Sequence, residues 1–245
     1  MSDMSKRLIT ITRELSKGVG ALTFSEPVAY VYNPLEYAWK SHKSYLEKYG
    51  EGKGRVLLIG MNPGPWGMAQ TGVPFGEVAN VRDFLGIEEQ IQKPNPEHPK
   101  REVLGFQCPR SEVSGRRVWE WARERFGCSE EFFRRFFVIN YCPLCFMEEG
   151  GKNRTPDKLK PKERDAVFEV CDVAIRKFVD VLEPSKIVGI GGFARKRAMQ
   201  TLSRNDIETI LHPSPASPIA NRGWAPQIEK QFETMGVLLP QMTFN

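Results

Sequence analysis

The sequence has no apolar run long enough to cross a bilayer. Its best candidate, residues 136–147, is short and is interrupted by Asn140, whereas a transmembrane helix needs about 20 apolar residues. Residues 1–15 carry charges throughout and lack the apolar stretch of a signal peptide. We therefore expect a cytoplasmic protein that has no membrane partner.

Cysteine is scarce and odd in number. The chain has five cysteines, and without an export signal a disulfide framework is not expected. Cys142 and Cys145 form a C-x-x-C pair, but no second pair accompanies them and Cys108 and Cys128 have no matching histidine. Buried structural cysteines are the favoured interpretation and an iron–sulfur cluster is the less favoured one, so no metal is expected.

The remaining composition is that of an ordinary globular protein. The chain has 245 residues, of which 40% are hydrophobic and 27% charged, and neither an internal repeat nor a low-complexity tract is present. A formal net charge of +5 is compatible with a nucleic-acid partner, but many basic enzymes bind none.

Short apolar runs that end in glycine or a polar residue alternate with helical patterns. Crossovers of this length favour a parallel sheet covered on both faces. We expect one domain over residues 1–245, a three-layer α/β/α fold with a central four-stranded parallel sheet and the helices of residues 1–50 packed on it. Strands are predicted at 55–60, 136–140, 186–192 and 208–212, helices at 5–17, 35–49, 77–86, 116–126, after Ser129, at 161–182, 193–204 and from Pro226, and a surface excursion at 91–115.

Ligands of open parallel sheets bind beyond the carboxyl ends of the strands. Two amides and a histidine follow such ends: Asn62 after the first strand, Asn140 at the end of the second and His212 at the end of the fourth. Taken singly, Asn62 could be a turn residue, Asn140 a cap and His212 a structural histidine. Taken together they predict one site. No carboxylate pair stands at these positions, so acid/base chemistry of the glycosidase type is not indicated.

One motif points to another class of enzyme. Residues 189–194 match the G-x-G-x-x-A fingerprint of dinucleotide-binding folds between a strand and a helix. That motif requires an acidic residue at the end of the next strand, where His212 stands; Glu208 lies at the beginning of that strand. We interpret the glycines as close packing, with amides that could hold a backbone phosphate, and keep a dinucleotide-dependent oxidoreductase as the alternative.

The loop at residues 60–78, GMNPGPWGMAQTGVPFGEV, closely resembles the first motif of the single-strand-selective monofunctional uracil-DNA glycosylases, a branch of the uracil-DNA glycosylase superfamily. The resemblance covers about residues 55 to 225, in the same order. It extends through 97–117, 138–144 and 212–224.

The resemblance implies a monofunctional DNA glycosylase of base excision repair, which flips uracil or a related base from DNA and leaves an abasic site. Asn62 would position the attacking water and His212 would face the pyrimidine O2. Asn140 would bind the Watson–Crick edge, Phe75 would stack on the base, and backbone at Met61, Gly64 and Met68 would shape the pocket. The segment from Pro213 to Trp224 resembles the wedge that enters the duplex; its expected DNA-binding residues are Pro213, Ser214, Pro215, Ala216, Ser217 and Arg222.

The sequence departs from the family at two positions. Vertebrate members carry an arginine where this chain has Ala216, which puts the strength of the wedge on paired DNA in question, and Trp66 stands where relatives often have phenylalanine. No lysine matches a Schiff-base position, so simple hydrolysis without a cofactor is expected.

The expected partner is single- and double-stranded DNA that contains uracil, bound by a monomer. A bacterial protein of this kind would be associated with the nucleoid and a eukaryotic one with the nucleus. A non-catalytic DNA-binding module is the third interpretation.

Overall fold

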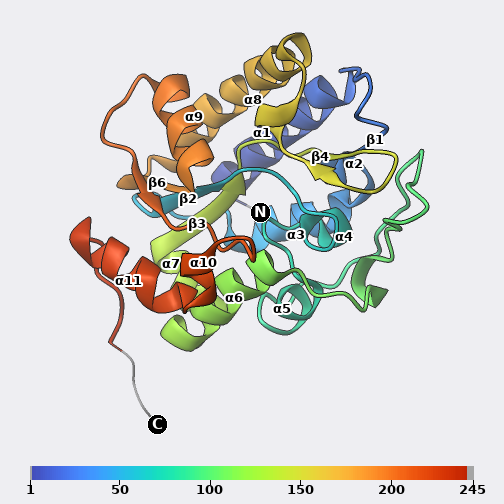
Figure 1. The fold of residues 1–245 in the computed structure, drawn as a ribbon. Coiled ribbons are helices and arrows are strands. Elements are labelled where there is room, and N and C mark those ends of the chain that lie inside the picture. Colours follow the sequence, from blue (N-terminus) through green and yellow to red (C-terminus); the bar gives the residue numbers. More distant parts are fainter. Residues whose placement is uncertain (1, 242–245) are drawn as a thin grey trace.

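A parallel sheet of four strands forms the centre of the computed structural model, which describes residues 2–241; residues 1 and 242–245 of the expected domain lie outside it. The strand order is β3-β2-β6-β7 (Figure 1). The predicted four-stranded parallel sheet is thus confirmed. The strands are β2 (Val56–Gly60), β3 (Phe136–Asn140), β6 (Lys186–Ile190) and β7 (Glu208–Ile210).

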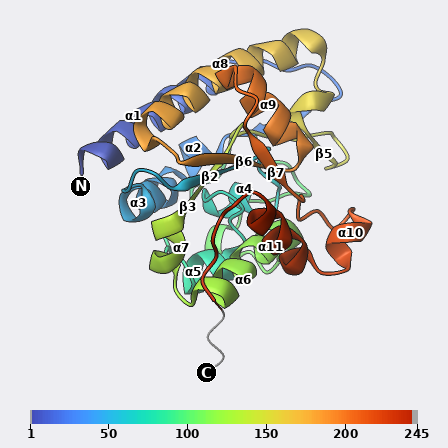
Figure 2. The same ribbon diagram turned by 90° about the vertical axis from the view of Figure 1, so that its left-hand side faces the viewer.

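Helices cover both faces of this sheet, as expected for three layers (Figure 2). One layer holds α1, which lies along α8, together with α9. Gly18 of α1 leaves room for Val170 of α8, because a Cβ at Gly18 would lie 2.7 Å from the Val170 Cγ1 atom. The other layer contains α6, α7 and α11. These helices are α1 (Asp3–Gly20), α6 (Val113–Phe126), α7 (Ser129–Arg135), α8 (Pro161–Leu182), α9 (Gly192–Leu202) and α11 (Trp224–Thr234).

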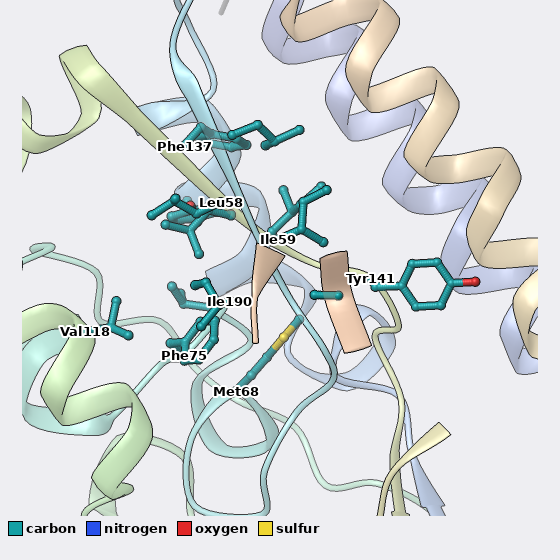
Figure 3. Packing of buried hydrophobic residues seen from close by; sticks show 14 of the residues in the cluster. Leu58, Ile59, Met68, Phe75, Val118, Phe137, Tyr141 and Ile190 are labelled. Atoms are coloured by element: carbon teal, nitrogen blue, oxygen red, sulfur yellow. Dashed lines mark hydrogen bonds between the residues drawn. The ribbon is translucent and has the colours of Figure 1, made fainter. Parts of the chain in front are cut away.

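The core is aromatic where α6, α7 and α11 meet the start of β3, and aliphatic along β2. All five residues of β2 are buried, as a strand covered on both faces requires. Trp121 of α6 stacks on Phe232 of α11 at 5.6 Å between ring centroids, and Phe132 stacks on Phe136 at 5.3 Å. Figure 3 shows Leu58 and Ile59 of β2 among the buried side chains of the core. In the described residues, no helix has the length and hydropathy to span a bilayer.

The expected helix at 35–49 is two helices, α2 (Pro34–Tyr37) and α3 (Trp39–Tyr49). The break lies at Ala38, which is fully buried and whose carbonyl oxygen would lie 2.8 Å from a Cβ at Gly72. Tertiary packing therefore overrides the continuous helical pattern. Other boundaries also differ from the prediction: α5 is Val78–Asp83, α11 begins at Trp224, and the short α10 (Pro218–Asn221) precedes it.

A second sheet was not predicted. It is antiparallel, with the order β1-β4-β5: β1 (Tyr30–Tyr32), β4 (Cys145–Met147) and β5 (Asn153–Arg154). Strands of two or three residues carry little periodicity, and Tyr32 pairs with Cys145 far along the chain. A short 3-10 helix, η2 (Pro156–Lys158), follows this sheet.

Residues 91–115 are only partly a surface excursion, so that prediction was wrong for the middle of the segment. His98 is fully buried there, and η1 (Gly105–Gln107) packs on α4 (Met68–Thr71). Gln70 of α4 fixes the segment, because its Nε2 donates to the Glu102 carbonyl at 2.9 Å and its Oε1 accepts from the Leu104 amide at 2.8 Å.

Candidate active site

A cavity of about 380 Å³ opens at the carboxyl ends of β2 and β3 and beside the loop after β7, a size typical of small-molecule sites. It brings together the three side chains that sequence analysis placed at strand ends, Asn62, Asn140 and His212. The structure puts His212 two residues beyond β7, not at its last residue as expected. The lining residues are Met61, Asn62, Pro63, Gly64, Met68, Phe75, Glu112, Ser114, Asn140, Asn153, Thr155, His212 and Ser214.

The amide of Asn62 is oriented by the backbone of another loop. Its Nδ2 donates to the Leu144 carbonyl at 3.1 Å and to the Pro63 carbonyl at 3.3 Å. Both amide protons are thereby directed at the protein, and Oδ1 is the atom of this side chain left for an occupant of the cavity. An oxygen acceptor of this kind can hold a water molecule.

Asn140 and Phe75 converge above Gly60. Gly60 pairs with Asn140 across β2 and β3, and a Cβ at Gly60 would collide with Asn140 Oδ1 and lie 2.6 Å from Phe75 Cε2. The Asn140 Nδ2 lies 3.2 Å from Met68 Sδ, a weak acceptor that a better one displaces at little cost. Figure 3 shows Phe75 and Met68 near each other at this edge of the sheet.

The backbone of Phe75 is held in a left-handed conformation, with φ 53°, which a bulky residue adopts only when its surroundings enforce it. Trp119 Nε1 donates to the Phe75 carbonyl at 3.0 Å. Gly115 packs its Cα against the same carbonyl, because a Cβ there would collide with it. Helix α6 therefore fixes the ring that forms one wall of the cavity.

His212 is neutral at neutral pH. Burial lowers the pKa of its imidazole below the usual 6.5. Among residues 2–241, no protein group hydrogen bonds to the ring, so its one N–H remains available in the cavity. Gly191 makes the space for this side chain, because a Cβ there would lie 3.0 Å from His212 Cβ.

The expected wedge residues lie beside the cavity, and of them only Ser214 lines it. Pro213, Pro215, Ala216, Ser217 and Arg222 belong to the loop and to the ends of α10. Ala216 and Arg222 are exposed there, and Figure 2 shows α10 projecting from the body of the molecule.

Arg117 of α6 holds this loop. Its Nη1 donates to the carbonyls of Pro213 at 3.1 Å and Ser214 at 3.2 Å, and its Nη2 donates to Asn221 Oδ1 at 2.8 Å. A single guanidinium thus fixes the loop at both ends.

Sequence reasoning missed four polar residues of the cavity. Glu112 and Ser114 reach it from the N-terminus of α6; Asn153 and Thr155 reach it from β5 and the residue after β5. The available signals were the short apolar segment 145–147 followed by the Gly-Gly pair at 150–151, which can form a hairpin turn, and a glutamate directly before a helix. At the four strand ends the structure, like the sequence, has no carboxylate pair.

Comparison with known proteins decides between the interpretations. A profile of the uracil DNA glycosylase superfamily matches residues 47–233. The single-strand selective monofunctional uracil DNA glycosylase of Bos taurus is 49% identical over 226 residues, which covers 91% of this chain and 83% of that protein. The Rattus norvegicus protein of the same name is 46% identical over 233 residues, covering 94% and 84%.

The chain belongs to the single-strand-selective monofunctional uracil-DNA glycosylase family, within the uracil-DNA glycosylase superfamily.

The crystal structure of SMUG2 from Pedobacter heparinus has the same fold, with a TM-score of 0.66 and 19% identity over 92% of this chain and 98% of that one. Membership of the uracil-DNA glycosylase family confirms the expected class, a DNA glycosylase that hydrolyses N-glycosyl bonds.

The glycine motif at 189–194 and the Cys142–Cys145 pair do not line the cavity. Gly189 packs directly on α9, because a Cβ there would lie 2.7 Å from the Arg195 Cα, whereas a Cβ at Gly192 would meet nothing within 4 Å; the close-packing interpretation therefore holds for Gly189 and not for Gly192. Glu208 begins β7, so no carboxylate stands where a dinucleotide ribose would need one. Cys142 and Cys145 are free and buried, and in the described part of the chain no three acidic, histidine or cysteine side chains are grouped for a metal.

Proposed function

We propose that this protein extrudes uracil from DNA and hydrolyses its N-glycosidic bond, leaving an abasic site in an intact strand. The observation that carries this proposal is the placement of Asn62, Asn140 and His212 around one cavity that has Phe75 as a wall. The names of the relatives, uracil-DNA glycosylases from mammals, support uracil as the base.

Asn140 would discriminate the base. Its Nδ2 donates to uracil O4 and its Oδ1 accepts from N3–H, a pattern that cytosine reverses. A base with the wrong hydrogen-bonding edge leaves buried polar groups unpaired, and each unpaired group costs about 1–3 kcal/mol of binding free energy. The ring of Phe75 stacks on the base and returns about 1–3 kcal/mol of the cost of unstacking it.

His212 would supply most of the stabilisation of the transition state. As the C1′–N1 bond breaks, its electron pair moves onto the uracil ring, and the neutral imidazole N–H donates to O2. Removal of one preorganised donor of this kind costs about 10²–10³ in rate. Asn62 Oδ1 holds the water that attacks the cationic sugar.

The test is release of free uracil. The protein is incubated with a uracil-containing oligonucleotide, and alkali cleavage followed by a gel reports abasic sites. Cleavage before alkali, or trapping of a covalent adduct with sodium borohydride, would contradict hydrolysis without strand cleavage; in the described structure no lysine lines the cavity. Tight binding of uracil DNA without release of base would instead indicate a non-catalytic binding module.

We also propose that the protein acts as a monomer, because all residues of the cavity and of the loop beside it come from one chain. Its proposed substrates are both single- and double-stranded DNA. Ala216 is small and exposed, so it displaces little of a base stack. Ala216→Arg is expected to raise excision from paired duplex more than from single strands. Equal gains on both substrates would mean that Ala216 is not part of the wedge.

A further inference from the structure

One carboxylate of the cavity has no part in the mechanism described so far. Glu112 lies immediately before α6 and lines the same cavity as Asn62. In the described residues its carboxylate makes no salt bridge, and the backbone amide of Gly115 is a hydrogen-bond donor beside it. A half-buried carboxylate that lines a cavity and has no cationic partner is costly in a purely structural role, so this placement calls for a function.

The loop that carries Asn62 is built around this carboxylate. A Cβ at Gly64 would collide with Glu112 Oε1, and a Cβ at Gly67 would lie 2.5 Å from Glu112 Cδ. Two glycines in the Asn-Pro-Gly-Pro-Trp-Gly loop thus leave room for the acid. Gly64 is two residues beyond Asn62, so the carboxylate and the Asn62 amide share one wall of the cavity.

The chemistry of this wall is incomplete without a base. Asn62 can hold a water through Oδ1, but an amide cannot accept the proton that water loses when it bonds to the sugar. We propose that Glu112 accepts this proton and is a catalytic base of the glycosylase. The C1′–N1 bond breaks with its electrons on uracil N1, the water oxygen bonds to C1′, and the water proton passes to the Glu112 carboxylate and then to solvent.

The surroundings of Glu112 set the pH at which it can act. Its pKa is raised to about 7: burial is the largest effect, the carboxylate of Glu77 also raises the pKa, and the nearby Gly115 amide lowers it. Two other titratable groups lie near it: the Cys145 thiol, which burial keeps neutral by raising its pKa, and His212, which lines the same cavity. A base with a pKa near the working pH is well matched to general base catalysis.

The inference rests on the proposed uracil excision and predicts its pH dependence. Ionised Glu112 is the active form, so the single-turnover rate rises as the pH increases toward about 7 and is level above it. Because burial lowers the pKa of His212, protonation of the imidazole affects the rate only at still lower pH.

The experiment compares Glu112→Gln, Glu112→Asp and the wild type between about pH 6 and about pH 9, at single turnover. The single-turnover rate of Glu112→Gln is expected to be about 10²-fold lower than that of the wild type above about pH 7, and it is expected not to rise with pH near 7. The affinity of this variant for abasic DNA is expected to be retained. Glu112→Asp keeps a carboxylate and is expected to restore the limb at a reduced rate. Glu120→Gln, an exposed acid on the same helix, is the matched control with wild-type kinetics.

Three results separate the possibilities. A Glu112→Gln variant as fast as the wild type, with the same pH profile, overturns the inference. A Glu112→Gln rate that is lower at every pH but still rises toward about pH 7 also overturns the inference, because another group then titrates and Glu112 only shapes the loop. A thermal melt of the variant identifies a folding defect. Wild-type protein that releases no uracil at any pH refutes the proposed function itself.

Discussion

The Asn62 Nδ2 donates a hydrogen bond to the Leu144 carbonyl at 3.1 Å, and this contact joins the loops that follow β2 and β3. An aspartate at position 62 has no proton to offer that carbonyl and places two acceptors face to face. We therefore expect Asn62→Asp to lower the excision rate by about 10²-fold, even though a carboxylate is the stronger base. A rate equal to the wild type at single turnover would mean that the Leu144 contact does not orient the amide.

Position 60 needs a glycine because of the side chains packed in the pocket, and not because of the strand conformation. Because its missing Cβ is the space filled by Asn140 Oδ1 and the Phe75 ring, Gly60→Ala is expected to displace both groups and reduce kcat/KM for uracil by about 10²-fold or more. Gly192→Ala is the matched control, since a Cβ there meets nothing within 4 Å. Equal activity of the two variants in a uracil-release assay would refute the placement of Asn140 above Gly60.

Asn140→Asp changes which base edge fits the cavity. A carboxylate cannot donate to uracil O4 but accepts from the cytosine N4–H₂ group. We expect excision of uracil to fall by about 10–10²-fold and weak release of cytosine to become measurable. The assay follows both free bases by chromatography from matched oligonucleotides, and unchanged uracil kinetics would contradict the assignment of Asn140 to the base edge.

The frame of this site could be predicted from sequence, but its interior could not. Buried runs such as residues 56–60 and 136–140 predict strands, and the rule that ligands bind beyond parallel strand ends is enough to group Asn62, Asn140 and His212. Glu112 follows no strand. It reaches the cavity because Gly115 packs on the Phe75 carbonyl, a contact between distant segments that no local pattern records.

The smaller sheet was missed for the same reason. Strand β5 has two residues, too few for an alternating pattern, and only its pairing with β4 brings Asn153 to the cavity. The break at Ala38 likewise depends on its packing against Gly72 and not on a local helix-breaking residue.

Arg117 provides a test of the loop beside the cavity. Arg117→Ala removes all three of its hydrogen bonds to Pro213, Ser214 and Asn221 and leaves the loop free to move. Because a wedge must resist the base stack, excision from paired duplex is expected to fall by about tenfold and excision from single strands much less. The adjacent Arg116→Ala, which removes an exposed guanidinium, serves as the control. An equal loss on both substrates would mean that Arg117 acts on the pocket and not on the wedge.

His42 links the fold to pH. Its Nδ1 donates to the Gly72 carbonyl at 2.7 Å, and burial lowers its pKa to about 4. The unfolded chain binds this proton near pH 6.5, so the stability that neutral His42 provides is present above that pH and is lost as the pH falls toward about 4. The full effect is at most about 3 kcal/mol.

Glu112 acts in the opposite direction over an overlapping range, because its raised pKa makes ionisation unfavourable in the folded state as the pH rises toward about 7. The stability of the wild type alone therefore reports only the net effect, and the difference between wild type and His42→Gln isolates the histidine. Glutamine can still donate to Gly72 but does not titrate. Urea unfolding at about pH 7.5 and about pH 4.5 is expected to show the variant losing about 2–3 kcal/mol less than the wild type on acidification. Parallel losses would mean that His42 is not buried in its neutral form.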